Sequence, residues 1–200
     1  MLEARLLQGS VGFPRKVDGE TRESSRTLRY TAEEGVSLDV QSTASMVKSL
    51  AGLDLYLSTF ARENSLLIID EPEMNAHPEA QLKITELLAI LAARGLYVVI
   101  TTHSPYITDH LINLMQASRL TETMQESVSE RFKLGSTEAF LDPEKVSVYH
   151  FSEERNVESV LSRDDALIDL SSFSNPSDYT SNLYSVLLDA ERGIDLPKRD

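Results

Sequence analysis

The sequence is first notable for what is absent from it. Its 200 residues include no cysteine, no tryptophan and only eight glycines. Without cysteine, disulfide bonds and thiolate metal sites are excluded. None of the glycines belongs to a G-x-x-x-x-G-K-[ST] sequence, so these residues contain no phosphate-binding loop of that type. No apolar run approaches the roughly 20 residues that a membrane-spanning helix needs, and we expect no membrane association.

The charge balance is acidic. Lys and Arg number 19 against 32 Asp and Glu, which gives a formal net charge of −13. Contacts to nucleic-acid phosphates need clustered basic side chains, so we expect this segment not to bind nucleic acid alone. The 41% apolar content suffices for a core. The first residues, Met1–Arg5, lack a signal-peptide apolar stretch, and we expect a cytoplasmic protein.

The N-terminal third predicts short strands followed by a helix. Strand candidates occur at residues 6–7, 28–30 and 36–40, separated by turn-forming pairs. Residues 46–62 then predict an amphipathic helix, because apolar side chains recur there at helical spacing. Ser45 is a plausible N-cap for that helix.

The middle of the chain alternates between strand and helix patterns. Leu66–Ile69 and Tyr97–Ile100 are continuous apolar runs, typical of strands buried on both faces of a sheet. Pro78 begins a helix after the first strand, and Ser104-Pro105 caps and begins a helix after the second. This alternation predicts an α/β fold with a parallel sheet and right-handed crossovers.

The C-terminal part has weaker patterns. Residues 117–142 are polar and predict a mobile loop or a weak helix. Residues 146–151 and 157–161 predict a hairpin, and residues 177–192 predict a terminal helix.

Charged and polar residues follow both central strands directly. Asp70 and Glu71 come at the end of the first strand, and His103 at the end of the second. Ligands of α/β sheets bind at the carboxyl ends of the strands, so these side chains are expected at one site. There Asp70 could hold Mg²⁺ and Glu71 could polarise a water as a general base. The neutral imidazole of His103 could hydrogen-bond a phosphate.

These motifs resemble those of ABC-type ATPase heads. Leu66–Glu73 resembles a Walker B strand with its catalytic glutamate, Asn75–Gln81 the D-loop region, and Thr101–Pro105 the H-loop. The residue sequence of these motifs is most similar to that of the AAA-named ABC-like ATPases grouped with the overcoming-lysogenisation-defect (OLD), RecF and SMC proteins. Within this group it resembles the ATPases of bacterial antiphage and abortive-infection systems. The resemblance is specific over about residues 42–110.

The resemblance implies a P-loop NTPase-like head, present as an incomplete half. It implies β strands returning into the head over residues 1–41, the ATPase core over residues 42–116, and a loop, hairpin and helix completing the head over residues 117–200. It further implies ATP as substrate and Mg²⁺ as cofactor, with Asp70 organising the metal and Glu71 as the base.

Further roles are implied by the same resemblance. His103 would sense the γ-phosphate, and Asn75 and His77 would lie at a dimer interface. The signature segment falls at Ser42–Val47, where Ser42, Thr43 and Ser45 offer hydroxyls beside a helix N-terminus. That segment lacks the glycines of the family signature, and a plain N-cap at Ser45 is the alternative.

Heads of this family close on ATP as dimers, so the resemblance implies an association switch driven by hydrolysis. The expected partners are a second head or a missing half that supplies the phosphate loop, together with an effector nuclease or toxin. The family's phosphate loop precedes the segment matched here, so we expect a C-terminal portion of a longer ATPase, a natural half-protein or a decayed ATPase, inactive alone and prone to dimerise.

Two other functions remain open from the sequence. A non-catalytic interaction module that keeps the head fold would explain the missing phosphate loop. A metal-dependent hydrolase would use Asp70, Glu71 and Glu73 with His77, although Pro72 and Pro78 restrict that geometry.

Overall fold

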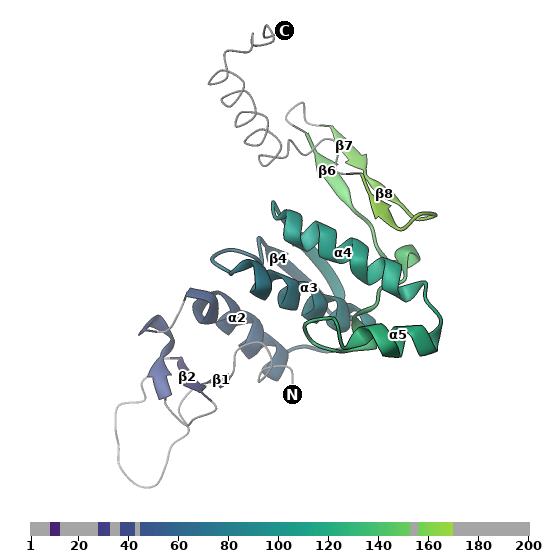
Figure 1. Ribbon diagram of the computed structural model, residues 1–200. Coiled ribbons are helices and arrows are strands. Elements are labelled where there is room, and N and C mark those ends of the chain that lie inside the picture. Colours follow the sequence, from purple (N-terminus) through teal and green to yellow (C-terminus); the bar gives the residue numbers. More distant parts are fainter. Residues whose placement is uncertain (1–8, 13–27, 33–36, 43–44, 153–155, 170–200) are drawn as a thin grey trace, which may run out of the picture. The chain divides into compact units, whose positions relative to one another are not determined.

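The structure is a computed structural model that describes residues 9–12, 28–32, 37–42, 45–152 and 156–169 (Figure 1). The chain divides into two compact units, residues 1–147 and 148–200, which are described separately below. Within the described residues, no helix has both the length and the apolar character needed to cross a bilayer.

The first unit begins with a small antiparallel sheet. Its strands are β1 (Gly9–Gly12), β2 (Arg29–Ala32) and β3 (Ser37–Asp39), in that order across the sheet. A 3₁₀ turn, η1 (Val40–Ser42), leads from β3 toward helix α2 (Ser45–Thr59). The predicted strands at 28–30 and 36–40 are thus confirmed with shifted bounds, and the one predicted at 6–7 lies outside the described residues.

A buried carboxylate attaches this sheet to α2. Asp54, on the helix, is buried and accepts a hydrogen bond of 3.0 Å from the backbone N–H of Val11 on β1. The pairing satisfies a strand N–H that would otherwise be buried without a partner. The sheet and α2 therefore pack against the same hydrophobic core, to which they contribute Val11, Val47 and Leu50.

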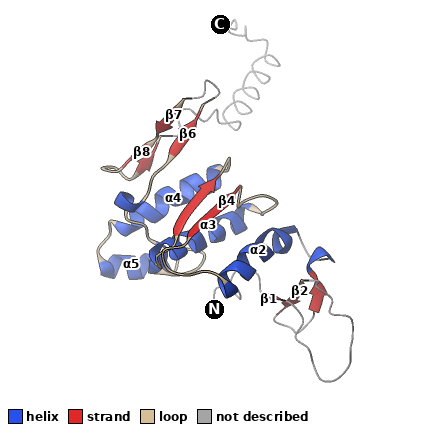
Figure 2. Ribbon diagram, turned by 180° about the vertical axis from the view of Figure 1, so that it is seen from behind, coloured by secondary structure: helices blue, strands red, loops and turns tan. Residues whose placement is uncertain are grey.

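The centre of the unit is a strand–helix–strand crossover. Strand β4 (Leu66–Asp70) pairs in parallel with β5 (Tyr97–Thr101), with Asp70 opposite Thr101, and α3 (Pro78–Ala93) connects them. Helix α4 (Pro105–Ser118) follows β5, and the two views show α3 and α4 on the same side of the strands (Figures 1 and 2). The parallel α/β arrangement predicted from the sequence is confirmed.

Local signals explain where these helices begin and end. His77 and Ser104 are the N-caps of α3 and α4, and each precedes a proline at the first helical position. Proline suits that position because its missing N–H has no helical partner there. Gly95 follows α3 at φ +92°, the left-handed conformation in which glycine ends helices.

One prediction about the central strands is wrong. They were expected to be buried on both faces, but only alternate residues pack against the core: Leu67, Ile69, Val98 and Ile100. The opposite face is exposed, with Ile68 at 66% and Tyr97 at 64%. Helices cover one side of the strands, whereas no described element covers the other.

The prediction of a loop or weak helix at residues 117–142 is only partly right. Helix α5 (Glu122–Ser129) occupies its centre, and the 3₁₀ turns η2 (Thr137–Ala139) and η3 (Pro143–Lys145) follow. The segment is anchored by apolar packing, with Phe132 and Phe140 edge to face at 5.0 Å between ring centres. Leu134 and Ala139 are buried in the same core as α3.

In the second unit, the predicted hairpin is confirmed. Strand β6 (Tyr149–Phe151) pairs antiparallel with β7 (Val157–Ser159), and the short strands β8 (Leu161–Ser162) and β9 (Leu167–Ile168) pair with each other. The predicted terminal helix at 177–192 lies outside the described residues. The proposed domain boundaries at 41/42 and 116/117 stay predictions.

Candidate functional site

The carboxyl ends of β4 and β5 bring the first two site residues together. The Thr101 hydroxyl donates a hydrogen bond to Oδ1 of Asp70, its partner across the strands. The backbone N–H of Glu71 donates to the Thr101 carbonyl at 3.1 Å and contacts the Thr101 hydroxyl oxygen at 3.2 Å. One threonine therefore fixes both the Asp70 carboxylate and the backbone of Glu71.

Glu71 leaves the strand in a costly backbone conformation. Its φ is +45°, in the left-handed region that residues with a Cβ rarely adopt. The conformation turns the chain at the strand end, and Oε1 of Glu71 lies 3.5 Å from Nε2 of His103. The His103 side chain is 86% exposed and that of Glu71 37%, so both are accessible to a ligand. Strain of this kind concentrates at functional sites.

Glu73 ties the turn after β4 to the turn after β5. Its Oε1 accepts hydrogen bonds from the Thr102 hydroxyl at 2.7 Å and from the backbone N–H of His103 at 2.9 Å. The Thr102 hydroxyl oxygen in turn accepts from the N–H of Ser104 at 3.0 Å. The other oxygen of Glu73, Oε2, is buried and has no hydrogen-bond partner among the described residues.

A second connection joins the same two turns. The Ser104 hydroxyl donates to Oε1 of Gln81 at 2.5 Å, and Nε2 of Gln81 donates to the carbonyl of Ala76 at 2.9 Å. Ser104 is buried and also caps α4 by accepting from the N–H of Tyr106. The start of α4 is therefore bound to the start of α3.

Asn75 and His77 lie on the exposed surface of the turn that follows Glu71. Asn75 has φ +63°, a conformation that asparagine tolerates better than most residues. His77 accepts a hydrogen bond from the N–H of Glu79 at its Nδ1, at 3.3 Å. Both side chains face solvent, and their role at an interface stays a prediction.

The signature segment is described only through its backbone. Ser42 is the last residue of η1, and Ser45 is the first residue of α2. Thr43 lies outside the described residues. The structure thus places a helix N-terminus at the predicted position, and the nucleotide-binding role of these three residues stays a prediction.

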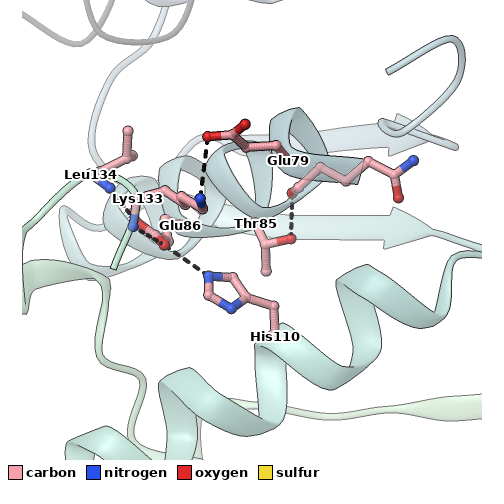
Figure 3. Close-up of polar contacts among 7 residues, drawn as sticks. Glu79, Thr85, Glu86, His110, Lys133 and Leu134 are labelled. Atoms are coloured by element: carbon pink, nitrogen blue, oxygen red, sulfur yellow. Dashed lines mark hydrogen bonds and ion pairs between the residues drawn. The ribbon is translucent and has the colours of Figure 1, made fainter. Parts of the chain in front are cut away.

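A buried polar cluster lies between α3, α4 and the segment after α5 (Figure 3). Glu86 is fully buried, and Nε2 of His110 lies 2.8 Å from its Oε1. The backbone N–H groups of Lys133 and Leu134 donate to the same carboxylate at 2.8 and 2.6 Å. A buried carboxylate needs such donors, since leaving it unpaired costs several kcal/mol.

Lys133 also contacts the first turn of α3. Its Nζ lies 3.2 Å from Oε1 of Glu79. This hydrogen bond and the positive charge of Lys133 lower the pKa of Glu79 below its ordinary value, with smaller contributions from Lys83 and His77. Both side chains are exposed, so the pair is a surface contact.

The end of β4 offers an oxygen donor that suits a magnesium ion. The exposed Asp70 carboxylate is a hard donor of the kind that Mg²⁺ prefers, and the Thr101 hydroxyl lies beside it. Within the described residues, no three His, Asp or Glu side chains converge as a ready-made metal cluster. Glu73 instead binds Thr102 and His103, and His77 caps α3, so the alternative hydrolase site is not supported.

Sequence reasoning therefore identified the residues at the strand ends but missed the residues that hold them. Thr101, Thr102 and Gln81 lie inside the segments that resemble the H-loop and the D-loop, but nothing in the sequence indicated the hydrogen bonds that they make. Glu86 and His110 stand 24 positions apart on two separate helices. A carboxylate in the middle of the apolar stretch Ile84–Leu91 was the one available signal for that cluster.

Comparison with known proteins shows which ATPases the chain resembles. Residues 10–108 match the family model described as the AAA ATPase domain. Over this segment the chain is similar to that family. The match includes both central strands and every residue of the Asp70, Glu71 and His103 site.

The chain is also similar to a curated protein. Over 125 residues the chain is 28% identical to the Old nuclease of Escherichia phage P2. The aligned part is 58% of this chain, and the chain spans about a fifth, 21%, of that relative's length. The two matches together support a likeness to AAA and OLD-like ATPases.

A solved structure shows a distant likeness. It comes from a study of the ATP-driven dimerisation and DNA-stimulated activation of SMC ATPases, and the match is 10% identical with a TM-score of 0.46. It covers 82% of this chain and 81% of the other. A likeness of this degree supports no conclusion about the function of this chain.

Proposed function

We propose that Asp70, Glu71 and His103 form the hydrolytic half of an Mg-ATP site. The chain would act as the switch segment of an ABC-type ATPase, in which hydrolysis drives a conformational change through association of two heads. The observation that carries this proposal is Glu71, held in the left-handed conformation with its carboxylate 3.5 Å from the His103 imidazole.

In the proposed reaction Glu71 is the general base. Its carboxylate accepts a proton from a water as the water oxygen attacks the γ-phosphorus and the bond to the leaving oxygen of ADP breaks. The His103 imidazole stands beside Glu71 and donates a hydrogen bond to a γ-phosphate oxygen. Asp70 would hold Mg²⁺, which when bound supplies positive charge to the phosphates.

Phosphate binding requires a contribution from another segment or another chain. The 200 residues contain no G-x-x-x-x-G-K-[ST] sequence, whose backbone N–H groups would cradle the phosphates. We propose that this loop comes from a longer chain or a partner, and that the 200 residues alone hydrolyse no ATP. The helix N-terminus at Ser45 would face the nucleotide of the opposing head.

The biological setting is proposed from the relative. The phage P2 protein is named a nuclease, and the chain spans a fifth of it. We propose a bacterial defence or other DNA-related system in which the ATPase switch controls an effector such as a nuclease or toxin. A second candidate, a non-catalytic interaction module, is favoured by the missing phosphate loop alone.

Phosphate release from Mg-ATP tests the proposal. In an assembly that supplies the phosphate loop, Glu71→Gln is expected to lower turnover by about 10²- to 10⁴-fold, because a general base contributes that much. ATP binding should persist, since the substitution removes only the proton acceptor. The matched control is Glu122→Gln, an exposed glutamate at the start of α5, which should leave turnover unchanged.

Two outcomes would contradict the proposal. Unchanged turnover in Glu71→Gln would exclude Glu71 as the base. Absence of turnover in every assembly that contains a phosphate loop would favour the interaction module.

A further inference from the structure

The His103 side chain has little packing to hold it. Its imidazole is 86% exposed, and β5 ends at Thr101, two residues earlier. An exposed side chain makes few contacts, so it contributes little to holding its own backbone in one conformation. Ordering that backbone costs conformational entropy, which other interactions must offset. The position of His103 must therefore come from hydrogen bonds to its backbone and its neighbours.

Glu73 supplies those hydrogen bonds from the opposite turn. One oxygen of its carboxylate accepts from the His103 N–H at 2.9 Å and from the Thr102 hydroxyl at 2.7 Å. Hydrogen bonds to an ionised carboxylate are stronger than those between neutral groups. Glu73 is partly buried and follows Pro72, which is buried and has a restricted backbone, so the acceptor is itself well placed.

The same oxygen holds the loop at two consecutive residues. Thr102 passes the restraint on, because its hydroxyl oxygen accepts from the N–H of Ser104 at 3.0 Å. Glu73 thus binds two successive residues of the loop directly and contacts a third, Ser104, through Thr102. Ser104 is also held by Gln81, so Glu73 is the connection that acts on His103 itself.

We propose that Glu73 is the positioning residue that holds His103 opposite Glu71. This inference rests on the proposed roles of Glu71 and His103. Glu73 touches neither water nor phosphate in the proposed reaction, and it acts by fixing the His103 backbone. It also couples the two turns, so that the proton acceptor and the phosphate-sensing histidine move together when a nucleotide binds or leaves.

Amide hydrogen exchange of the 200-residue chain, followed residue by residue by NMR, tests the proposal without nucleotide. In Glu73→Ala the His103 amide should exchange at least about tenfold faster, because it loses its acceptor. The Glu71 amide, which donates to Thr101, should be unchanged. Glu73→Gln keeps one acceptor oxygen and should fall between the wild type and Glu73→Ala.

Two further variants make the result specific. Thr102→Val removes the hydroxyl but leaves the bond between the His103 N–H and Glu73, so the His103 amide should stay protected while the Ser104 amide exchanges faster. If Glu73→Ala fails to fold, this variant and Glu73→Gln carry the test. Glu122→Ala, with one exposed carboxylate removed, should change neither amide.

The inference is overturned if Glu73→Ala leaves the His103 amide protected, or if all amides of β4 and β5 accelerate equally, which would indicate general destabilisation. In an assembly that hydrolyses ATP, Glu73→Ala should lower kcat at least tenfold and change KM little. If Glu71→Gln abolishes turnover there and Glu73→Ala does not affect kcat, the inference fails and the proposed function stands. If Glu71→Gln has no effect, the proposed function fails, whatever the exchange result.

Discussion

Glu71 combines an energetically costly backbone conformation with the proposed role of general base. A residue with a Cβ at φ +45° costs roughly 1–2 kcal/mol relative to an ordinary conformation. The two contacts of its N–H with Thr101 hold it there. The strain is the consequence of turning a carboxylate toward His103 directly at the end of a strand.

Glycine at position 71 should therefore give a more stable protein than alanine at the same position. Because glycine adopts φ > 0 without steric cost, we expect Glu71→Gly to raise the free energy of unfolding by about 1 kcal/mol relative to Glu71→Ala. Both variants lack the carboxylate, so their difference isolates the backbone. Denaturant unfolding measures it, and equal stability of the two variants would show that the conformation carries no strain.

At the scale of elements, one buried carboxylate joins three parts of the fold. Glu86 on α3 pairs with His110 on α4 and accepts from two N–H groups after α5 (Figure 3). The site residues lie in the turns that precede α3 and α4. The contact between Glu86 and His110 therefore also fixes the positions of these two helices relative to each other. His110 and Leu134 are buried, so water has little access to replace Glu86 there.

Truncation of Glu86 should thus be severe. We expect Glu86→Ala to lower the free energy of unfolding by about 3–5 kcal/mol, because it leaves a buried histidine and two N–H groups without their acceptor. Glu138→Ala, which removes an exposed partner of Arg94, should cost less than about 1 kcal/mol. Urea unfolding of both variants provides the comparison, and a loss below 1 kcal/mol in Glu86→Ala would contradict this account.

The contact between Lys133 and Glu79 should make stability weakly dependent on pH. The pKa of Glu79 is lowered in the folded state, so the pair stabilises the fold above the ordinary value of 4.5. That stabilisation is lost as the pH falls from there through the lowered pKa. Thermal unfolding of Lys133→Met should show a small deficit against the wild type at pH 7 that disappears in acid; a constant deficit would indicate lost packing instead.

The sequence predicted those elements whose signals are local. Pro78 and the pair Ser104-Pro105 mark helix starts, and the apolar runs before Asp70 and Thr101 mark strands. Helix α5 was predicted only as one of two possibilities for its segment, because that segment is held by distant groups such as Glu86 and by the contact of Phe132 with Phe140. The hydrogen bonds of Glu73 were likewise not predictable. They depend on the left-handed turn at Glu71, and glutamate is not a residue type that indicates such a turn.

At the scale of the whole molecule, the uncovered side of the central strands is the notable feature. Leu66, Ile68, Tyr97 and Val99 are between 49% and 66% exposed and adjoin one another across the parallel pair. Parallel sheets normally have both faces covered, because both faces are apolar. This surface is suited to burial against further protein.

We expect the 200-residue chain to self-associate through this surface. Ile68→Lys combined with Val99→Lys should shift sedimentation toward the monomer, because two charges on the face oppose its burial. Leu120→Lys, at an exposed apolar position after α4, is the control and should leave association unchanged. A wild-type chain that stays monomeric at high concentration would contradict this expectation.

The separation of the site contacts along the chain has a consequence for folding. Five hydrogen bonds join the end of β4 to the end of β5, and they connect residues 29 to 31 positions apart. All of them close when a single loop of that length closes, at a modest entropic cost. The geometry around Glu71 and His103 can thus form early and as one step during synthesis, as soon as residue 104 has emerged, before the segment after α5 is available to reinforce it.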